Sequence, residues 1–204
     1  MSAPPPDAFA ATVSRETLAK LKAYVGLLED WNARHNLVSA NSLAEVWQRH
    51  VADSAQLSPL IPEGSKSLID LGSGAGFPGM VLALLRPELH VVLTESIAKK
   101  CRFLEEVAAR TGANVEVRHA RMESLKPEPF DIVTARACAP LAKLLTYAQR
   151  FQGRATRNLF LKGQSVEVEL TEARKTWKMA VTKHPSLTDA SGTILEIREL
   201  RHAG

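Results

Sequence analysis

Cysteine is almost absent from this chain. Only Cys101 and Cys138 occur among 204 residues, and they stand alone rather than in a metal-binding cluster. Two isolated cysteines indicate a reducing compartment, which predicts a cytoplasmic protein without a zinc cluster. The six histidines show no spacing typical of metal ligands. We therefore expect no metal site.

Long apolar runs are also absent. No run approaches the roughly 20 residues that a membrane-spanning helix needs. The first seven residues contain three successive prolines and lack the basic-then-apolar pattern of a signal peptide. These features predict a protein without membrane association, in which residues 1–13 form a disordered tail and residues 14–204 form a single domain.

Positive charge is concentrated towards the C-terminus. Residues 140–204 hold 11 of the 26 Lys and Arg residues but only 6 of the 22 Asp and Glu residues. A basic face can contact phosphate groups. A solvated surface has the same composition, so charge alone leaves both interpretations open.

The first part of the domain has a helical pattern. Residues 14–34 place apolar side chains at the three- and four-residue spacing of one helix face. A second helix is expected from Ser42, a suitable N-cap, and a third over 53–60. We expect a helical extension over residues 14–62 and a different core over 63–204.

From residue 66 onwards, short apolar runs alternate with helical patterns. We expect strands at 67–71, 90–95, 114–119, 130–135 and 158–161, helices at 78–85, 98–110, 141–151 and 166–177, and two late strands at 179–184 and 193–200. This alternation predicts an α/β fold with a doubly wound, mostly parallel sheet and helices on both faces. The two late strands, joined by a loop, predict a C-terminal antiparallel hairpin at one edge.

A glycine-rich segment follows the first predicted strand. Residues 70–79 read DLGSGAGFPG, which predicts a strand, a tight turn and a helix that together bind a nucleotide-like cofactor. Asp70 favours one cofactor over another. A carboxylate there would repel the pyrophosphate of a dinucleotide but would suit the cationic sulfonium and ammonium groups of S-adenosylmethionine. We interpret Asp70, Gly72, Gly74 and Gly76 as a methyl-donor site, with NAD as the alternative.

Two further positions are consistent with a nucleoside ligand. Glu95 ends the second strand, where an acid can accept hydrogen bonds from ribose hydroxyls. NAD enzymes use the same device, so Glu95 does not discriminate between the two cofactors. Met122 follows the third strand, where an adenine ring could pack against it. Simple core filling is the alternative for Met122.

The segment after the fourth strand excludes some reactions. Residues 134–140 read TARACAP and lack the Asn/Asp-Pro-Pro-aromatic motif of enzymes that methylate adenine or glutamine amino groups. Cys138 could be the nucleophile of a cytosine-carbon methyltransferase, but it lacks the preceding proline, and a small buried cysteine fits better. Arg136, at the carboxyl end of a central strand, is expected to contact a phosphate or a base edge. A surface ion pair is the alternative.

A polar trio precedes the core. His50, Asp53 and Ser54 share one face of an unbroken helix. They form either a capping cluster or a group that overhangs the active site, and the pattern does not decide between these two.

Several short motifs together resemble one family. They are NLV at 36–38, HVADS at 50–54, the glycine segment at 70–79, Glu95 with Lys99 and Lys100, RA at 136–137 and LKG at 161–163. In this order they resemble the RsmG (GidB) family of bacterial methyltransferases, which modify ring nitrogen 7 of one guanine in the decoding-region loop of 16S ribosomal RNA. The likeness spans residues 14–200, and Phe77 is often leucine in the family.

The resemblance implies a fold, a cofactor and a substrate. The fold would be a Rossmann-like class I S-adenosylmethionine-dependent methyltransferase fold preceded by N-terminal helices, and the partner would be 16S ribosomal RNA or the small ribosomal subunit. Separately, we expect the enzyme to be a monomer. Cofactor contacts would fall on Gly72, Phe77, Met122, Glu123 and Arg136, with Gly74 and Glu95 lining the same cleft.

The implied reaction needs little acid–base chemistry. Guanine nitrogen 7 carries a lone pair and no proton, so catalysis would come mainly from positioning. We assign catalytic roles to Asp53, which could stabilise the cationic product, and to Arg136. Substrate contacts are assigned to Asn36, His50 and Lys162, and RNA phosphates to the basic C-terminal third, including Arg150, Arg154 and Arg157. The alternatives are a non-catalytic RNA-binding module, an NAD-dependent oxidoreductase, and a methyltransferase for a small molecule or a protein.

Overall fold

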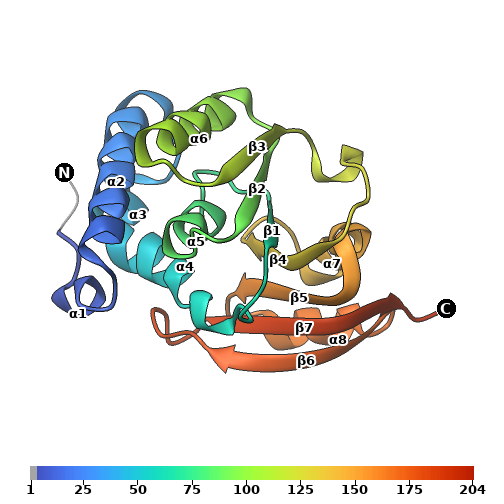
Figure 1. The fold of residues 1–204 in the computed structure, drawn as a ribbon. Coiled ribbons are helices and arrows are strands. Elements are labelled where there is room, and N and C mark those ends of the chain that lie inside the picture. The colour runs from blue at the N-terminus through green and yellow to red at the C-terminus, as the bar shows by residue number, and fades with distance from the viewer. Residues whose placement is uncertain (1–3) are drawn as a thin grey trace.

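The computed structural model describes residues 4–204, which form a seven-stranded sheet with helices on both faces (Figure 1). The strand order is β3-β2-β1-β4-β5-β7-β6. The strands are β1 (Ser67–Leu71), β2 (His90–Glu95), β3 (Val115–His119), β4 (Phe130–Arg136), β5 (Gln152–Lys162), β6 (Trp177–Pro185) and β7 (Thr193–His202). β1 to β5 are parallel, and β7 runs antiparallel to both β5 and β6. The predicted sheet and its C-terminal antiparallel pair are confirmed.

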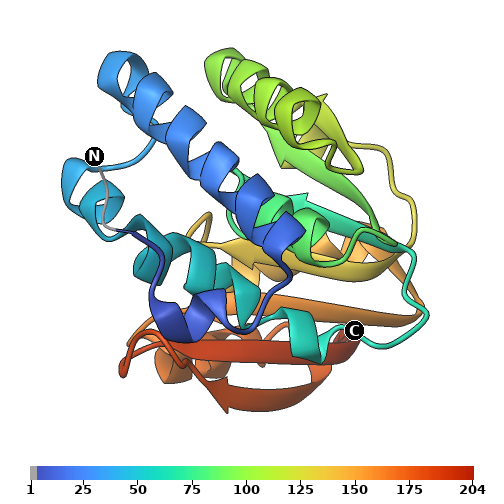
Figure 2. The same cartoon turned by 60° about the vertical axis from the view of Figure 1, so that its left-hand side comes forward.

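Two hydrophobic cores lie on the two faces of the sheet. The helices and turns are α1 (Asp7–Ala10), α2 (Arg15–His35), α3 (Ala40–Ala44), the π-helical η1 (Trp47–Ala52), α4 (Asp53–Ala55), η2 (Ser58–Leu60), α5 (Gly79–Leu85), α6 (Ala98–Thr111), η3 (Met122–Ser124), α7 (Leu141–Ala148), η4 (Gln149–Phe151) and α8 (Val166–Ala173). α2, α5 and α6 belong to one core, whereas α7 and α8 belong to the other. Figure 2 shows α2 running beside α6.

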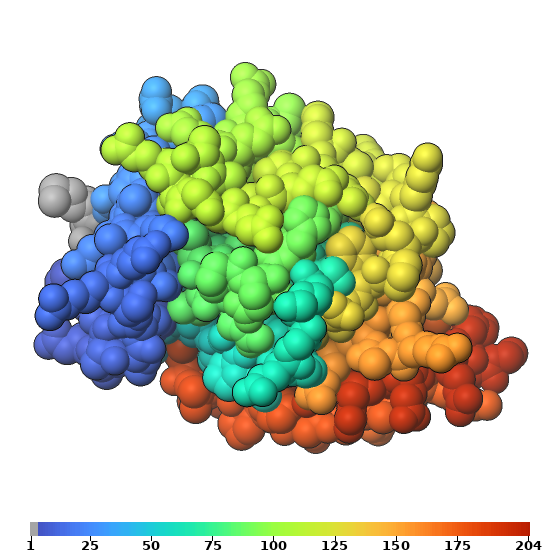
Figure 3. Space-filling model, viewed as in Figure 1, coloured from blue at the N-terminus to red at the C-terminus, as the bar shows by residue number. Residues whose placement is uncertain are grey.

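The long helix α2 is specified by its own sequence. Its N-cap, Ser14, accepts a hydrogen bond from the Thr17 N–H, and its C-cap, Asn36, adopts the left-handed conformation with φ of 48°. Its buried face includes Leu21, Tyr24 and Leu28, which belong to the same core as α5 and α6. The long helix of the N-terminal extension therefore packs against α5 and α6, and Figure 3 shows the extension lying directly against the rest of the molecule.

The N-terminal region differs from the prediction in two places. Residues 7–10, which the sequence placed in a disordered tail, form α1, and the Phe9 ring lies 6.2 Å from the Trp47 ring; residues 1–3 lie outside the described part. The helix expected from Ser42 begins earlier, because the Ser39 side chain accepts the capping hydrogen bond from the Ser42 N–H. The boundaries between tail, extension and core stay a prediction.

The C-terminal elements also differ from the prediction. β5 begins at Gln152 rather than 158, and Thr156 ties its first half to the Phe130 carbonyl oxygen. α8 ends at Ala173, and Trp177, which was expected to end that helix, begins β6. Trp177 is buried in the core beneath α7 and α8, and a strand conformation places it there.

Within residues 4–204, none of the helices combines the length and apolar character needed to cross a membrane.

Candidate active site

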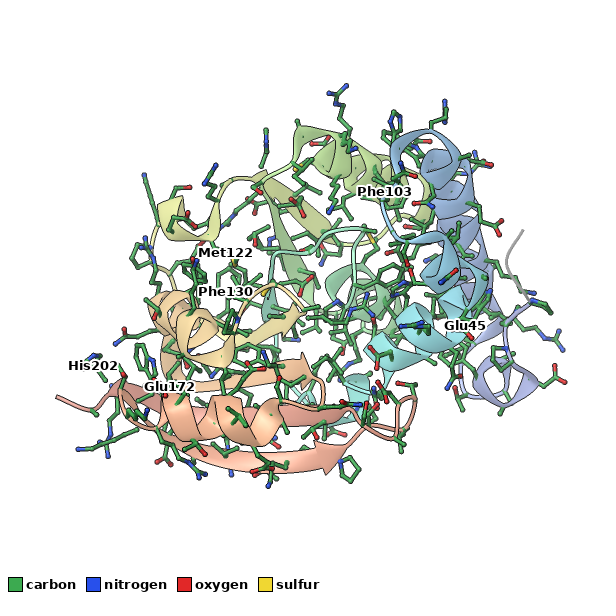
Figure 4. The ribbon with its side chains drawn as sticks, turned by 180° about the vertical axis from the view of Figure 1, so that it is seen from behind. Glu45, Phe103, Met122, Phe130, Glu172 and His202 are labelled. Atoms are coloured by element: carbon green, nitrogen blue, oxygen red, sulfur yellow. The ribbon has the colours of Figure 1, made fainter. Side chains whose placement is uncertain are left out.

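A cleft of about 1230 Å³ opens at the carboxyl ends of the central strands. Ligands bind at this edge in open α/β sheets. Its walls come from the turn after β1, the end of β2, the segments after β3 and β4, the N-terminal helices and the β6–β7 loop. Met122 and Glu45 both line it, and Figure 4 shows them well apart, on opposite sides of the centre of the molecule. The cleft therefore has room for more than one ligand group.

The turn after β1 needs glycine at two positions in the cleft wall. Gly72 has φ of +69°, and a Cβ there would lie 3.1 Å from the Cβ of Cys138. Gly74 has φ of +60°, and its N–H donates to Oε2 of Glu95 at 2.9 Å. Both residues line the cleft, as predicted. Without side chains, their backbone leaves this wall open to a ligand.

Glycine is needed at position 76 for a different reason, which is packing beneath the turn. Gly76 is buried with φ of +99°, and a Cβ there would lie 2.6 Å from the hydroxyl oxygen of Tyr24 and 3.0 Å from Leu104. That hydroxyl donates to the Ala75 carbonyl oxygen. The absence of a side chain at Gly76 therefore lets α2 and α6 pack beneath the turn, away from the cleft wall where the sequence placed Gly76.

Asp70 also lies beneath the turn. Its side chain is fully buried; Oδ1 accepts a hydrogen bond from Thr134 Oγ1 at 2.8 Å, and Oδ2 accepts one from the Gly79 N–H at 3.2 Å. Burial raises the pKa of Asp70 to about 6, although these hydrogen bonds oppose the shift. Asp70 was predicted to contact the cationic groups of the cofactor, but its side chain lies beneath the turn and outside the cleft lining. Asp70 instead joins β1 to β4 and to the start of α5.

Glu95 lies in the cleft, as predicted, and is held by the backbone. Its Oε1 accepts hydrogen bonds from the N–H groups of Ser96 and Ile97 at 2.7 and 2.8 Å, and its Oε2 accepts from Gly74. A carboxylate offers about four acceptor positions. One position on Oε2 is therefore left for a donor such as a ribose hydroxyl.

A smaller hollow of about 280 Å³ extends the site beside Glu95. Met122 lines both the hollow and the cleft, whereas the exposed Glu123 lines only the hollow. Arg121 completes this side. The predicted positions after β2 and β3 are thus brought together, in a space bounded by apolar, acidic and backbone groups that suits a nucleoside.

Arg136 connects three walls of the cleft. Its Nη1 donates to the Arg49 carbonyl oxygen at 2.9 Å and lies 3.3 Å from Oδ2 of Asp53, while Nη2 donates to Nδ1 of His50 at 2.8 Å. The guanidinium also lies 5.2 Å from the centre of the Phe77 ring. His50 and Asp53 therefore face the site. This decides between the two interpretations of the polar trio that the sequence left open. Arg136 forms an ion pair with Asp53 inside the cleft.

Phe77 lies in an aromatic stack within this cluster. The His50 ring stacks on it at 4.7 Å and 18°, and the Tyr24 ring at 5.3 Å and 28°. Burial, together with the charges of Arg136 and Arg49, lowers the pKa of His50 to about 3. His50 is therefore neutral near pH 7. Because its Nδ1 accepts from Arg136, we assign the proton to Nε2.

We expect the wild type to lose stability relative to His50→Gln as the pH falls. The unfolded chain binds the imidazole proton near pH 6.5 and the folded chain only near pH 3. This contribution is complete above pH 6.5 and is lost towards pH 3, amounting to about 3 kcal/mol between pH 7 and pH 4. Urea unfolding at both pH values measures it, and equal losses in the two proteins would contradict the assignment.

Cys138 is not an activated nucleophile. Burial, followed by the charge of Asp70, raises the pKa of its thiol to about 11. The side chain packs beside Gly72 and the partly buried Met122. It is therefore a protonated packing group at neutral pH.

We expect Cys138→Ala to retain methyl transfer within about twofold, because a protonated thiol contributes no attacking group. Methylation rate and cofactor affinity should be measured together. A variant that binds cofactor normally but has lost turnover would restore the cysteine mechanism.

The predicted substrate residues lie in unequal positions. Asn36 is exposed at the end of α2, directly before Leu37 and Val38, which line the cleft. The Lys162 ammonium lies in the wall but contacts Glu169 Oε2 at 2.6 Å and donates to the Ala139 carbonyl oxygen at 3.1 Å. Its charge is thus compensated inside the protein, and the substrate roles of Asn36, His50 and Lys162 stay predictions.

The predicted phosphate-binding arginines lie away from the cleft. Because β5 is parallel to β4, its first residues lie at the opposite edge of the sheet. Arg154 is exposed there, and Arg150 donates to the Leu125 carbonyl oxygen. Arg157 pairs with Glu196 at 3.2 Å. Charge counting along the sequence could not reveal this placement. At the cleft, the Lys and Arg residues besides Lys162 are Arg49, Lys100 and Arg136, of which Arg136 is paired with Asp53.

Sequence reasoning missed the β6–β7 loop. Ser186, Thr188 and Asp189 line the cleft, although more than 90 residues separate them from the glycine motif. The only signal was a loop between the two late strands, and the sequence did not show which edge of the sheet this loop would reach. Within residues 4–204, no group of three or more His, Cys, Asp or Glu residues is placed to hold a metal ion.

The fold is that of Rossmann-like methyltransferases. The structure is similar to an O-methyltransferase from Bacillus cereus in complex with SAH, with a TM-score of 0.61 and 17% identity over 87% of this chain and 91% of that chain. It is also similar to TYW2 from M. jannaschii in complex with AdoMet, with a TM-score of 0.58 and 13% identity over 75% and 76% of the two chains. At these identities the likeness shows the fold.

Sequence similarity gives the family. The family model for rRNA small subunit methyltransferase G (GidB) matches residues 17–198. The ribosomal RNA small subunit methyltransferase G of Rhodospirillum rubrum is 48% identical over 201 residues, which cover 97% of this chain and 99% of that protein. The protein of the same name from Rhodospirillum centenum is 50% identical, covering 94% and 88%. The chain belongs to this family.

Family and fold together settle the class of enzyme. The protein is an S-adenosylmethionine-dependent methyltransferase. This confirms the predicted class of enzyme and the predicted cofactor, and it sets the NAD alternative aside. The site fits this cofactor: Gly72 and Gly74 keep side chains out of the wall, and Glu95 retains one acceptor position.

Proposed function

We propose that this enzyme methylates ring nitrogen 7 of one guanine in the decoding-region loop of 16S ribosomal RNA. The relatives' names support ribosomal RNA of the small subunit as the substrate. The protonation of His50 and Cys138 supports a ring nitrogen as the target atom. His50 has a strongly lowered pKa and its Nδ1 already accepts a hydrogen bond, while Cys138 holds its proton. A nucleophile with a lone pair and no proton needs no base.

The cofactor would bind along the turn after β1. Bound S-adenosylmethionine supplies an electrophilic methyl group on a sulfonium. We propose that Gly72, Gly74 and Phe77 form the wall beside it, and that Glu95 accepts a ribose hydroxyl. Met122 and Glu123 would border the adenine. Asp70 and Gly76 would support the turn from below.

We propose that Asp53 holds Arg136 in position in the cleft. Oδ1 of Asp53 accepts from Gln56 Nε2 and Thr188 Oγ1 at 2.8 and 2.7 Å, and its Oδ2 faces Arg136. Most of its acceptor positions are thus occupied by the protein. This geometry supports a positioning role for Asp53, in which it fixes Arg136 and the β6–β7 loop, more than direct stabilisation of the cationic product.

We propose that RNA approaches over the rim that includes Asn36, His50 and Lys162, with Arg49 and Lys100 near the phosphates. These two cations line the cleft, and cations beside the reacting base would orient the RNA backbone. The enzyme would act on small-subunit particles in the cytoplasm, and a monomer stays the prediction for its assembly.

The deciding experiment uses radiolabelled S-adenosylmethionine and small-subunit particles from a strain that lacks the gene. We expect one labelled guanine in the decoding-region loop, located by chemical cleavage specific for 7-methylguanine. Particles from a strain that carries the gene are the control and should accept little label. Label at another base, or none in a protein that binds cofactor, would refute the proposed target.

A further inference from the structure

The loop between β6 and β7 belongs to the same edge of the sheet as the cofactor turn. Thr193, which begins β7, pairs both with Lys162 at the carboxyl end of β5 and with Pro185 at the end of β6. The loop over residues 186–192 therefore lies beside the carboxyl ends of the parallel strands. Its residues Ser186 and Thr188 line the cleft.

This loop is fixed to the cluster around Arg136. The Leu187 N–H donates to Gln56 Oε1 at 2.8 Å, and Gln56 Nε2 donates to Ser186 Oγ at 3.2 Å. Thr188 Oγ1 donates to Asp53 Oδ1 at 2.7 Å. The position of the loop is thus coupled to Gln56 and to Asp53, the ion-pair partner of Arg136.

The loop is also closed on itself. The Ser186 N–H donates to the Gly192 carbonyl oxygen at 3.1 Å, and the Gly192 N–H donates to the Asp189 carbonyl oxygen at 2.9 Å. A Cβ at Gly192 would lie 2.9 Å from the Cβ of Ser186, so this close approach requires glycine. A loop with these bonds presents its outward side chains in a defined direction.

Leu187 is the outward side chain at the tip. Its exposed fraction is 85%, compared with 74% for Val168 and 43% for Ile97, the other large apolar side chains exposed in the described part. A single exposed apolar residue needs no explanation by itself. Leu187, however, stands between two residues of the cleft wall, and its own backbone N–H is anchored to Gln56. An exposed leucine is thereby held next to residues that line the cleft.

We propose that this loop is part of the RNA-binding surface and that Leu187 packs against a base next to the target guanine. The inference rests on the proposed function. A base must leave its stack before its ring can enter a protein pocket. Apolar side chains such as leucine occupy the space between bases that unstack in nucleic-acid complexes. Leu187 would fill that space while the target enters the cleft.

The test compares Leu187→Ala with Val168→Ala, a matched loss of an exposed apolar side chain on α8. We expect Leu187→Ala to lower kcat/KM for small-subunit particles by about tenfold, and Val168→Ala to leave it unchanged. S-adenosylmethionine affinity and Tm should match the wild type in both variants, because Leu187 touches neither core nor cofactor wall. Leu187→Met, which keeps an apolar side chain, should restore most of the rate.

Each outcome separates this inference from the proposed function. If the wild type labels the particles and Leu187→Ala equals Val168→Ala, the role of Leu187 is wrong while the substrate stands. If Leu187→Ala weakens cofactor binding, the loop supports the cofactor site and the inference fails. If the wild type labels no ribosomal RNA, the proposed function fails first.

Discussion

Replacing Arg136 with methionine should lower methyl transfer by about 100-fold or more. The guanidinium contacts the Arg49 carbonyl oxygen, the Asp53 carboxylate and Nδ1 of His50 together. Methionine offers no donor, so all three groups lose their charged partner in a part-buried site. The groups that Arg136 holds together would then shift within the site, and a misplacement of about 1 Å is enough to lower a rate by about 100-fold.

The matched control is Arg157→Met. Arg157 also pairs with a carboxylate, that of Glu196, but it is outside the described cleft lining. Both variants should lose some stability, and only Arg136→Met should lose cofactor affinity and turnover. Arg136→Lys should recover only part of the rate, because an ammonium cannot reach the three acceptors as a planar fork does. Equal turnover in the two methionine variants would show that Arg136 merely contributes to folding.

The second large effect is expected for Gly79→Ala, which should destabilise the folded protein. This residue begins α5, and an added Cβ would collide with the Leu93 side chain and lie 2.7 Å from the Cβ of Asp70. Both neighbours are fully buried. Gly79→Ala should therefore lower the free energy of unfolding by about 3 kcal/mol, at the upper end of the usual range for overpacking. It should also weaken the hydrogen bond from the Gly79 N–H to Asp70.

Gly26→Ala is the control for this prediction. Gly26 lies inside α2, and an added Cβ meets none of the described atoms within 4 Å. The same change should therefore stabilise the protein, by up to about 1 kcal/mol, because alanine favours the helix. Urea unfolding of the two variants at a common m-value gives both numbers. Similar values at the two glycines would contradict the packing described around Gly79.

The core of the fold was predictable because its signals are local. Each parallel strand is a short apolar run, and the glycine segment at 70–79 marks the first turn. The π-helical turn over Trp47–Ala52 was not predictable, because the change in helical pitch has no marker in the apolar spacing. Trp177 was assigned to the wrong element because the sequence does not reveal which core an aromatic ring joins.

The site was predictable where a residue follows directly from a strand. Gly72, Gly74, Glu95 and Arg136 fall in the cleft for that reason. Asp70 was expected in the cleft but lies beneath the turn. The direction of a side chain beside a tight turn depends on its hydrogen-bond partners, which here are Thr134 and Gly79.

Long-range contacts account for the rest of the site. Asp53 and Thr188 are hydrogen-bonded across 135 residues of chain, and no periodic pattern encodes such a pair. The same holds for Tyr24, whose hydroxyl supports the turn at Ala75 from α2.

The order of strands also determines when the sheet can be completed during synthesis. β7 is the last strand of the chain, yet it lies between β5 and β6. Until it emerges from the ribosome, β5 has an open edge and β6 lacks the strand with which it pairs. Nascent chains that stop before Thr193 therefore expose two unpaired strands, which invite association with other chains. The synthesis of β7 (Thr193–His202) thus decides whether a newly made enzyme closes its sheet or needs the protection of a chaperone.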